Sequence, residues 1–312
     1  MKSVNLYKLD KVVVQAILSN LLTEEVLAQN AFVPCGNYDS RRLGFSLNLD
    51  DTFASDQKVG TLLKITEQLK KPEAYAVDSR LKLREAQHKA DTGQSVKKAE
   101  LSKWKAEITE SLLPETHPKE PKTFSLLIRK DGLVLVEGTS KLAEDMISLV
   151  RKALGSFPAT AIETNVPVGD LLDFLVKPVD PNQTLKARQE ETLVKIPEDD
   201  KFSLGQKVSI VTGEERKMNL TAGDVYGSEL ADLVVEGSYV TKLELTRDGA
   251  VMFTLKDDLT LAGVKFSNDI FDDGNTEAEE DEKAKAATDE LLMLEELCLV
   301  VDDILGRLEG EV

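Results

Sequence analysis

The residues of this chain best suited to chemistry are basic side chains concentrated between positions 80 and 105. Lysine and arginine on a rigid projection can neutralise the phosphates of a nucleic acid, which carry one charge per about 1.7 Å of duplex axis. Such contacts give affinity without reading base sequence. The same charges also fit the solvated faces of ordinary helices, and that alternative stays open. The residues concerned are Arg80, Lys82, Arg84, Lys89, Lys97, Lys98, Lys103 and Lys105.

Catalytic motifs are missing from the sequence. The two histidines, His88 and His117, lie in polar segments without the partner spacing of a metal site. Residues 205–209 lack the upstream glycine and the following hydroxyl of a phosphate-binding loop. Cys35 and Cys298 lie outside any Cys-x-x-Cys spacing and are expected to be reduced thiols. We therefore expect no enzyme, no metal site and no cofactor, with a hydrolase that uses unrecognised carboxylates as the weakest alternative.

Charge is distributed unevenly along the chain. The 312 residues carry 39 Lys and Arg against 56 Asp and Glu, a net charge of −17. Residues 267–312 hold 16 acidic and 3 basic side chains, whereas residues 60–122 hold 13 basic and 10 acidic ones. An acidic total excludes a protein coated in basic surface, but a local basic surface can still bind a polyanion within a Debye length of about 8–10 Å.

Neither a membrane span nor a secretory signal is predicted. No stretch approaches the roughly 18 apolar residues that a span needs, and the N-terminus has no uninterrupted apolar run. With 41% hydrophobic residues the chain can build real cores. We expect a soluble cytoplasmic protein without membrane partners.

Aromatic residues are scarce, at 5% of the chain. The basic segment contains only Tyr75 and Trp104, so a platform that stacks the bases of a single strand is poorly supported there. Any nucleic acid bound by this segment should be bound by charge.

The basic residues are carried by two predicted helical arms. The pattern over 73–113 is helical and is broken at 91–95, with Ser95 as the expected cap of the second arm. Leu101, Trp104, Ile108 and Leu112 form one apolar stripe. At about 1.5 Å per residue, an arm of some 17 residues reaches roughly 25 Å, enough to project from the body.

The surrounding segments predict a mixed α and β protein. We expect a strand at 3–9, a helix at 13–29 and strands within 41–66. Asp-Gly turns predict β-hairpins over 123–137 and 240–255, and the pattern of 140–154 predicts a helix that Gly155 ends. Residues 177–200 have the composition of a linker, and 114–121 form a polar loop punctuated by proline.

The C-terminus is an acidic run at 277–282 followed by a helix with an apolar seam. The seam repeats at intervals of three and four residues, which is typical of a helix that packs on a partner. The partner is either this chain or a second subunit. The seam consists of Leu291, Leu294, Cys298, Val301, Leu305 and Leu308.

Five short stretches are informative together, through their order and spacing along the chain. They are Ala31-Phe32-Val33-Pro34-Cys35-Gly36, Ser111-Leu112-Leu113-Pro114, Leu149-Val150-Arg151-Lys152-Ala153-Leu154-Gly155-Ser156-Phe157-Pro158, Val240-Thr241-Lys242-Leu243 and Val264-Lys265-Phe266. No single stretch would suffice, but in this order the chain resembles the RdgC family of recombination-associated proteins along nearly its whole length.

The resemblance implies an elongated α+β protomer with antiparallel hairpins, a projecting helical arm and a C-terminal helix. It implies that two protomers pair into a ring-shaped dimer and that DNA, double-stranded and also single-stranded, passes through the hole without sequence selection. It further implies antagonism of RecA and a nucleoid location. In this family arrangement, 1–76 and 122–165 form a central part, 77–121 a helical tip and 166–312 a base.

Two departures from the family pattern bear on these implications. Where the family places aromatic and apolar residues for a ring-closing contact, this chain has the polar residues 115–121. That contact is therefore expected to be weaker, polar or missing. The family's basic pair corresponds to Arg216 and Lys217, but Met218 follows where a polar residue is expected.

Two hypotheses follow. The first is a sequence-independent DNA-binding dimer that restrains RecA-dependent recombination, with Leu291, Leu294, Val301 and Leu305 at a subunit contact. The second is a protein-interaction module that uses the acidic C-terminal region and the seam without binding DNA. Under the first, the expected phosphate contacts are Arg80, Lys82, Arg84, Lys97, Lys98, Lys103, Lys105, Arg216 and Lys217.

Overall fold

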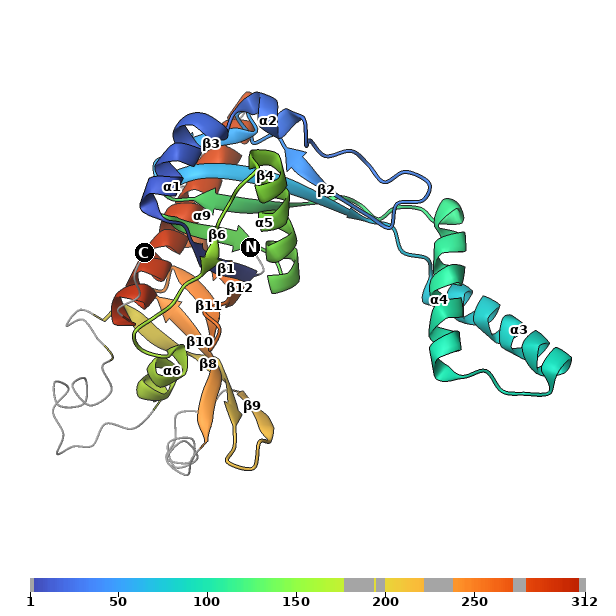
Figure 1. Ribbon diagram of the computed structural model, residues 1–312. Helices are drawn as coiled ribbons and strands as arrows, with labels where there is room; N and C mark the ends of the chain where they lie inside the picture. The colour runs from blue at the N-terminus through green and yellow to red at the C-terminus, as the bar shows by residue number, and fades with distance from the viewer. Residues whose placement is uncertain (1–2, 177–193, 195–199, 222–237, 272–278, 309–312) are drawn as a thin grey trace.

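A computed structural model describes residues 3–176, 194, 200–221, 238–271 and 279–308 (Figure 1). The linker predicted at 177–200 lies outside these residues except for Val194 and Asp200, and so does Glu277 of the acidic run. Helices accompany one large antiparallel sheet, so the α+β prediction is confirmed.

The strands form one antiparallel sheet in the order β2-β4-β5-β6-β1-β12-β11-β10-β8-β9, with β3 added to β4 and β7 added to β1. β1 joins two halves by pairing with β6 on one side and with β12 on the other. We call β12, β11, β10, β8 and β9 the second half of the sheet. The bounds are β1 Ser3–Lys8, β2 Arg41–Ser46, β3 Ala54–Gln57, β4 Gly60–Leu69, β5 Lys122–Ile128, β6 Leu133–Glu137, β7 Thr160–Ala161, β8 Phe202–Val211, β9 Lys217–Thr221, β10 Tyr239–Arg247, β11 Val251–Lys256 and β12 Leu261–Phe266.

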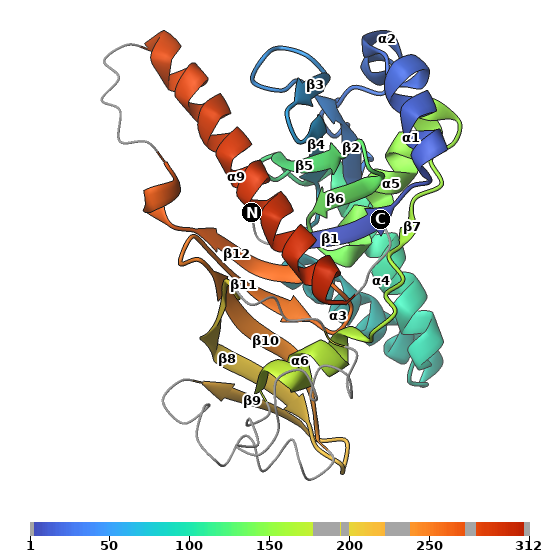
Figure 2. The same ribbon diagram turned by 90° about the vertical axis from the view of Figure 1, so that its left-hand side faces the viewer.

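Both faces of the first half are buried. Neighbouring residues of its strands enter different cores, as Leu62 and Leu63 do, which is typical of strands covered on both sides. Helices α1 (Lys11–Ala16), α2 (Glu24–Ala28) and α5 (Ser140–Leu154) lie on one face, and the C-terminal helix α9 (Glu279–Arg307) crosses the other (Figures 1 and 2).

The second half has only one apolar face. Along β11, Val251, Phe253 and Leu255 point into the core under α6 (Val168–Val176) and α9. The residues between them are more exposed, which gives the alternation of a sheet packed on one side only. In Figures 1 and 2 no helix of the described chain covers the opposite side, which we call the open face.

The predicted helical arms are confirmed as α3 (Ala74–Thr92) and α4 (Lys98–Leu112), which stand away from the sheet at the end of β4 and β5 (Figure 1). Trp104, Ile108 and Leu112 are buried in the small contact between the two helices. Gly93 adopts φ +70° at the end of α3, a conformation that glycine takes without strain. The expected cap Ser95 is wrong, because Lys97 occupies the cap position of α4.

Other local predictions had mixed outcomes. Both Asp-Gly hairpins are confirmed, and in the second Asp248 and Gly249 both have positive φ, as a tight hairpin turn requires. The single helix at 13–29 is wrong. It is interrupted after a π-helical turn, because the Thr23 side chain accepts a hydrogen bond from the backbone N–H of Val26 and starts α2.

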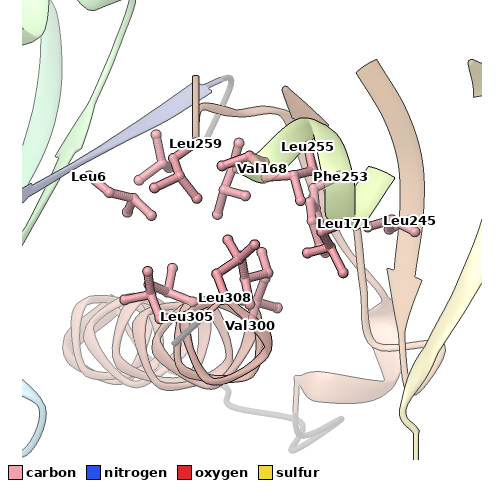
Figure 3. Packing of buried hydrophobic residues seen from close by; sticks show 14 of the residues in the cluster. Leu6, Val168, Leu171, Leu245, Phe253, Leu255, Leu259, Val300, Leu305 and Leu308 are labelled. Atoms are coloured by element: carbon pink, nitrogen blue, oxygen red, sulfur yellow. The ribbon is translucent and has the colours of Figure 1, made fainter. Parts of the chain in front are cut away.

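The seam of α9 packs within its own chain. Leu294, Val301 and Leu305 are 1%, 0% and 3% exposed, and Figure 3 shows Leu305, Leu308 and Val300 facing residues of the sheet and of α6. Leu291 is partly buried beside the same contact. A side chain buried in one chain has little surface left for another, so this burial favours packing within the chain, and the subunit contact expected at these four residues stays a prediction. The segment boundaries at 76, 121 and 165 stay predictions.

Candidate nucleic-acid interface

Three of the predicted arm cations form ion pairs within the helical pair. Arg80 lies 3.1 Å from a carboxylate oxygen of Glu115, Arg84 lies 2.8 Å from one of Glu107, and Lys105 lies 2.9 Å from one of Asp78. All these side chains are exposed, so each pair adds about 1 kcal/mol or less to stability. The pairs do reduce the positive charge available for a phosphate.

Arg84 has a further structural contact. Its guanidinium lies 4.5 Å from the ring centroid of Trp104, and His88 packs edge-on against the same ring. These contacts cover the indole where α3 crosses α4. Arg84 therefore helps to hold the two helices together.

Four other cations of the arms form no ion pair with the described residues. Lys82, Lys97, Lys98 and Lys103 are exposed, and no carboxylate of the described residues lies within ion-pair distance of them. Lys97 and Lys98 stand at the N-terminus of α4, where the helix dipole disfavours a positive charge. Their full charge is available to an anion.

The two members of the basic pair at the β8–β9 turn differ in their ion-pair partners. Arg216 lies 3.2 Å from Glu214, whereas Lys217, the first residue of β9, has no such partner among the described residues. Met218 pairs with Ile210 on the apolar side of the sheet, so it does not share the face of Lys217. Asn219 does share that face and is hydrogen-bonded to the Ser209 hydroxyl at 2.6 Å. A polar neighbour for Lys217 is thus present two residues along the strand.

Besides Lys217, the open face carries four lysines that were not among the predicted phosphate contacts. Cross-strand partners point to the same side of a sheet, and Lys242 of β10 is the partner of Lys256 of β11. Lys265 of β12 is the partner of Met252, which lies four residues from Lys256 along β11 and therefore on the same side of the sheet. Their sequence neighbours Leu243, Leu255 and Val264 belong to the core under α9. The lysines of the open face are Lys207, Lys217, Lys242, Lys256 and Lys265.

A single acidic residue occurs in the five strands of the second half, and it is withdrawn from solvent. Glu244 is 8% exposed, accepts a hydrogen bond from the backbone N–H of Gln206 and lies 3.4 Å from Lys207. Its side chain fills the space beside Gly205, where an added Cβ would come within 2.6 Å of it. For the other four lysines of the open face, the described residues provide no carboxylate within ion-pair distance.

The opposite face, under α9, has the reverse arrangement. Arg247 is 5% exposed and is held by Asp303 at 2.6 Å and by Glu296 at 3.3 Å. Beside the first half of the sheet, the same helix supplies Glu295 to the exposed Lys58 and Glu290 to Lys64. The acidic helix therefore neutralises the cations of its own face, and the unpaired lysines lie on the other.

Figure 1 shows how these surfaces are arranged. The protein is an arch, with α3 and α4 at one end and the β8–β9 hairpin at the other. The arms extend on the side away from α9, which Figure 2 confirms by placing α9 in front and α3 and α4 behind. The open face and the arms thus border the same concave side.

A cleft of about 440 Å³ lies beside α9, outside this concave side. Arg129 on its wall donates hydrogen bonds to Asp131 and Asp302. Burial raises the pKa of the Cys298 thiol to about 11, so this thiol is a poor nucleophile at neutral pH. Within the described residues, no three His, Cys, Asp or Glu side chains gather as a metal-holding cluster. The expectation of a non-catalytic protein stays a prediction.

No helix in the described ranges is long and apolar enough to cross a bilayer.

Taken together, the fold and the site define an arched α+β protein that presents unpaired lysines on its concave side. The family model described as "Putative exonuclease, RdgC" matches residues 1–311. The chain belongs to the RdgC family.

Curated relatives agree with this assignment over most of their length. The chain is 28% identical over 295 residues to the recombination-associated protein RdgC of Actinobacillus succinogenes, and 26% identical over 292 residues to that of Enterobacter sp. (strain 638). It is 25% identical to the protein of the same name from Salmonella typhimurium. Each match covers 92% of this chain and 91% of the relative.

Proposed function

We propose that this protein binds DNA without sequence selection on its concave side and thereby restrains RecA-dependent recombination. The observation that carries the proposal is the open face of a protein with net charge −17, where four lysines have no acidic partner among the described residues. Lysine side chains on a flat sheet contact phosphates but present little that distinguishes base pairs. The recombination role is supported by the names of the relatives.

The arms supply a second set of phosphate contacts. Among the phosphate contacts predicted in the arms, Lys82, Lys97, Lys98 and Lys103 form no ion pair with the described residues. Arg80, Arg84, Lys105 and Arg216 now have a smaller expected contribution, because each already has a carboxylate partner. Together with Lys217 and the open-face lysines, the four unpaired arm cations border the concave side of the arch.

A homodimeric ring is part of the proposal. An arch encloses DNA only if a second copy closes it, and the two ends of the arch are the surfaces available for that contact. Burial of the α9 seam and the polar residues 115–121 both argue for a contact that differs from the one first expected. Coating DNA in this way would exclude RecA filaments from it, and it would place the protein at the nucleoid.

The proposal is tested with random-sequence duplexes in a binding titration over a salt series. We expect log K to fall linearly with log salt, by about 0.9 per phosphate neutralised, and to the same extent for unrelated sequences. Affinity that ignores salt would contradict backbone contact. Absence of binding at low salt would favour the protein-interaction module instead.

Closure of the arch is tested separately on the full chain. The solution mass and a low-resolution scattering envelope should show two copies around a central hole. A monomer with no hole would leave the binding face intact but remove encirclement from the proposal.

A further inference from the structure

One aromatic side chain lies on the open face among its lysines. Tyr239 begins β10 and is 51% exposed. It is the cross-strand partner of Val211, which is in turn the partner of Lys217, so the three side chains share one side of the sheet. The next residue, Val240, is fully buried in the core on the other side. The register therefore assigns the Tyr239 ring to the open face.

Two unpaired cations stand on either side of this ring. Lys217 lies two strands away, about 10 Å at a strand spacing near 4.8 Å, and Lys242 lies three residues further along β10, at most about 10 Å. Both distances are within reach of a long lysine side chain that leans toward the ring. Among the described residues, neither cation has a carboxylate within ion-pair distance.

We propose that Tyr239 stacks on an unpaired nucleobase, while Lys217 and Lys242 hold the flanking phosphates of the same single strand. An exposed aromatic ring beside cations is the combination that proteins use to bind single strands without sequence preference. Bases within a duplex are already stacked on each other and offer the ring no free face. The inference rests on the proposed function, and it assigns to one end of the open face a preference for unpaired nucleotides.

The sequence of the basic arm segment gave little support for a platform that stacks the bases of a single strand. In that segment the Trp104 ring is buried between α3 and α4. Tyr239 lies far from the arm in sequence and reaches the lysines only through the pairing of β10, β8 and β9.

One substitution distinguishes two roles of the Tyr239 side chain, which are stacking on a nucleobase and merely covering Val211. Tyr239→Leu keeps an apolar cover over Val211 but removes the aromatic face, whereas Tyr239→Phe keeps both. We expect Tyr239→Leu to weaken binding of a mixed-sequence single strand by about 5- to 100-fold, and Tyr239→Phe to remain close to the unchanged protein. Fluorescence anisotropy with labelled oligonucleotides measures these affinities. Binding of a matched duplex should change less than about twofold in both variants.

Two controls sharpen the test. Tyr38→Leu removes another exposed tyrosine, 77% exposed, from the loop before β2 at the opposite edge of the sheet, and it should leave single-strand binding unchanged. An oligonucleotide with abasic positions keeps its phosphates but offers no base. The unchanged protein should bind it about as weakly as Tyr239→Leu binds the normal strand.

The outcomes are distinguishable from failure of the proposed function. If duplex and single strand both bind with normal salt dependence and Tyr239→Leu changes neither, the stacking inference is overturned while DNA binding stands. Equal loss on both ligands also overturns it, because that points to a general effect on the face. A photo-crosslink from a bromouracil strand, mapped by mass spectrometry, should fall on Tyr239; a crosslink confined to other residues counts against the inference.

Discussion

The two faces of the second half of the sheet hold their cations in opposite circumstances. Under α9, Arg247 is enclosed by Asp303 and Glu296, and Arg307 pairs with Asp200 while stacking on Phe202. On the open face, Lys242, Lys256 and Lys265 have no acidic partner among the described residues. The net charge of −17 is therefore an average over surfaces with different roles. One face uses charge to hold a helix, and the other leaves charge available for an external anion.

The largest expected effect comes from removing Arg247, the cation enclosed under α9. Replacing Arg247 with Ala removes the shared partner of Asp303 and Glu296 beneath α9. We expect the free energy of unfolding to fall by about 3 kcal/mol, since removing one member of a buried pair leaves the others uncompensated. Urea denaturation followed by circular dichroism measures the change.

The matched control is a cation on the open face. Lys265→Gln removes an exposed and unpaired charge, so it should alter the free energy of unfolding by less than about 0.5 kcal/mol. Equal destabilisation by Arg247→Ala and Lys265→Gln would show that the two faces do not differ in the way described.

The second prediction concerns DNA binding by the open face, where three lysines are neutralised together. The triple variant Lys242→Gln, Lys256→Gln and Lys265→Gln should bind random duplex about 100-fold more weakly near physiological salt. The slope of log K against log salt should decrease in magnitude by up to about 2.7, which is about 0.9 for each lost phosphate contact. A salt series measured by anisotropy gives both numbers.

The control for this variant removes the same charge from the other side of the molecule. Lys58 and Lys283 pair with Glu295 and Asp51 beside α9, and Lys285 lies in the same helix. Changing these three residues to Gln should alter duplex affinity by less than about threefold, because they contact no phosphate and act only through screened distances. A loss as large as that of the open-face variant would mean that net charge, rather than placement, controls binding.

Part of this arrangement could be predicted from local sequence, and part could not. The stripe from Leu101 to Leu112 predicted the helical pair, and the Asp-Gly turns predicted both hairpins, because these features depend on residues close together in the chain. The pairing of Arg84 with Glu107 depends instead on how α3 crosses α4. The spacing of Arg84 and Glu107 along the sequence does not determine the distance between their side chains.

The open face was missed for a related reason. The stretch Val251–Lys256 alternates apolar and polar residues, which predicts a strand with one covered face. Its lysine becomes part of a surface only when β8, β9, β10 and β12 are placed beside it, and β8 and β9 were not predicted. Which face is left uncovered depends on where α6 and α9 pack, and neither helix is adjacent to this strand in sequence.

The third prediction compares paired and unpaired cations within the arm. Changing Lys97 and Lys98 to Gln should weaken binding of all duplex sequences alike, by about 10-fold, because both charges at the start of α4 are available to phosphates. Changing Lys105 to Gln should weaken it less than about twofold, because that charge is already opposed by Asp78. Selective loss for one DNA sequence in the double variant would contradict backbone contact.

The smallest expected effect is also the most specific to the open face. Lys242 and Lys256 are direct cross-strand partners, and like charges at this spacing of about 5 Å destabilise a sheet. Lys256→Thr removes the repulsion and places a residue with good strand propensity opposite Lys242. We expect the free energy of unfolding to rise by about 0.5 kcal/mol while duplex affinity falls by several-fold. Urea denaturation and anisotropy on the same preparation would show both changes. A variant that gains stability and loses DNA affinity together identifies a charge kept for binding at a cost to the fold, whereas a loss of both would mean that Lys256 supports the sheet.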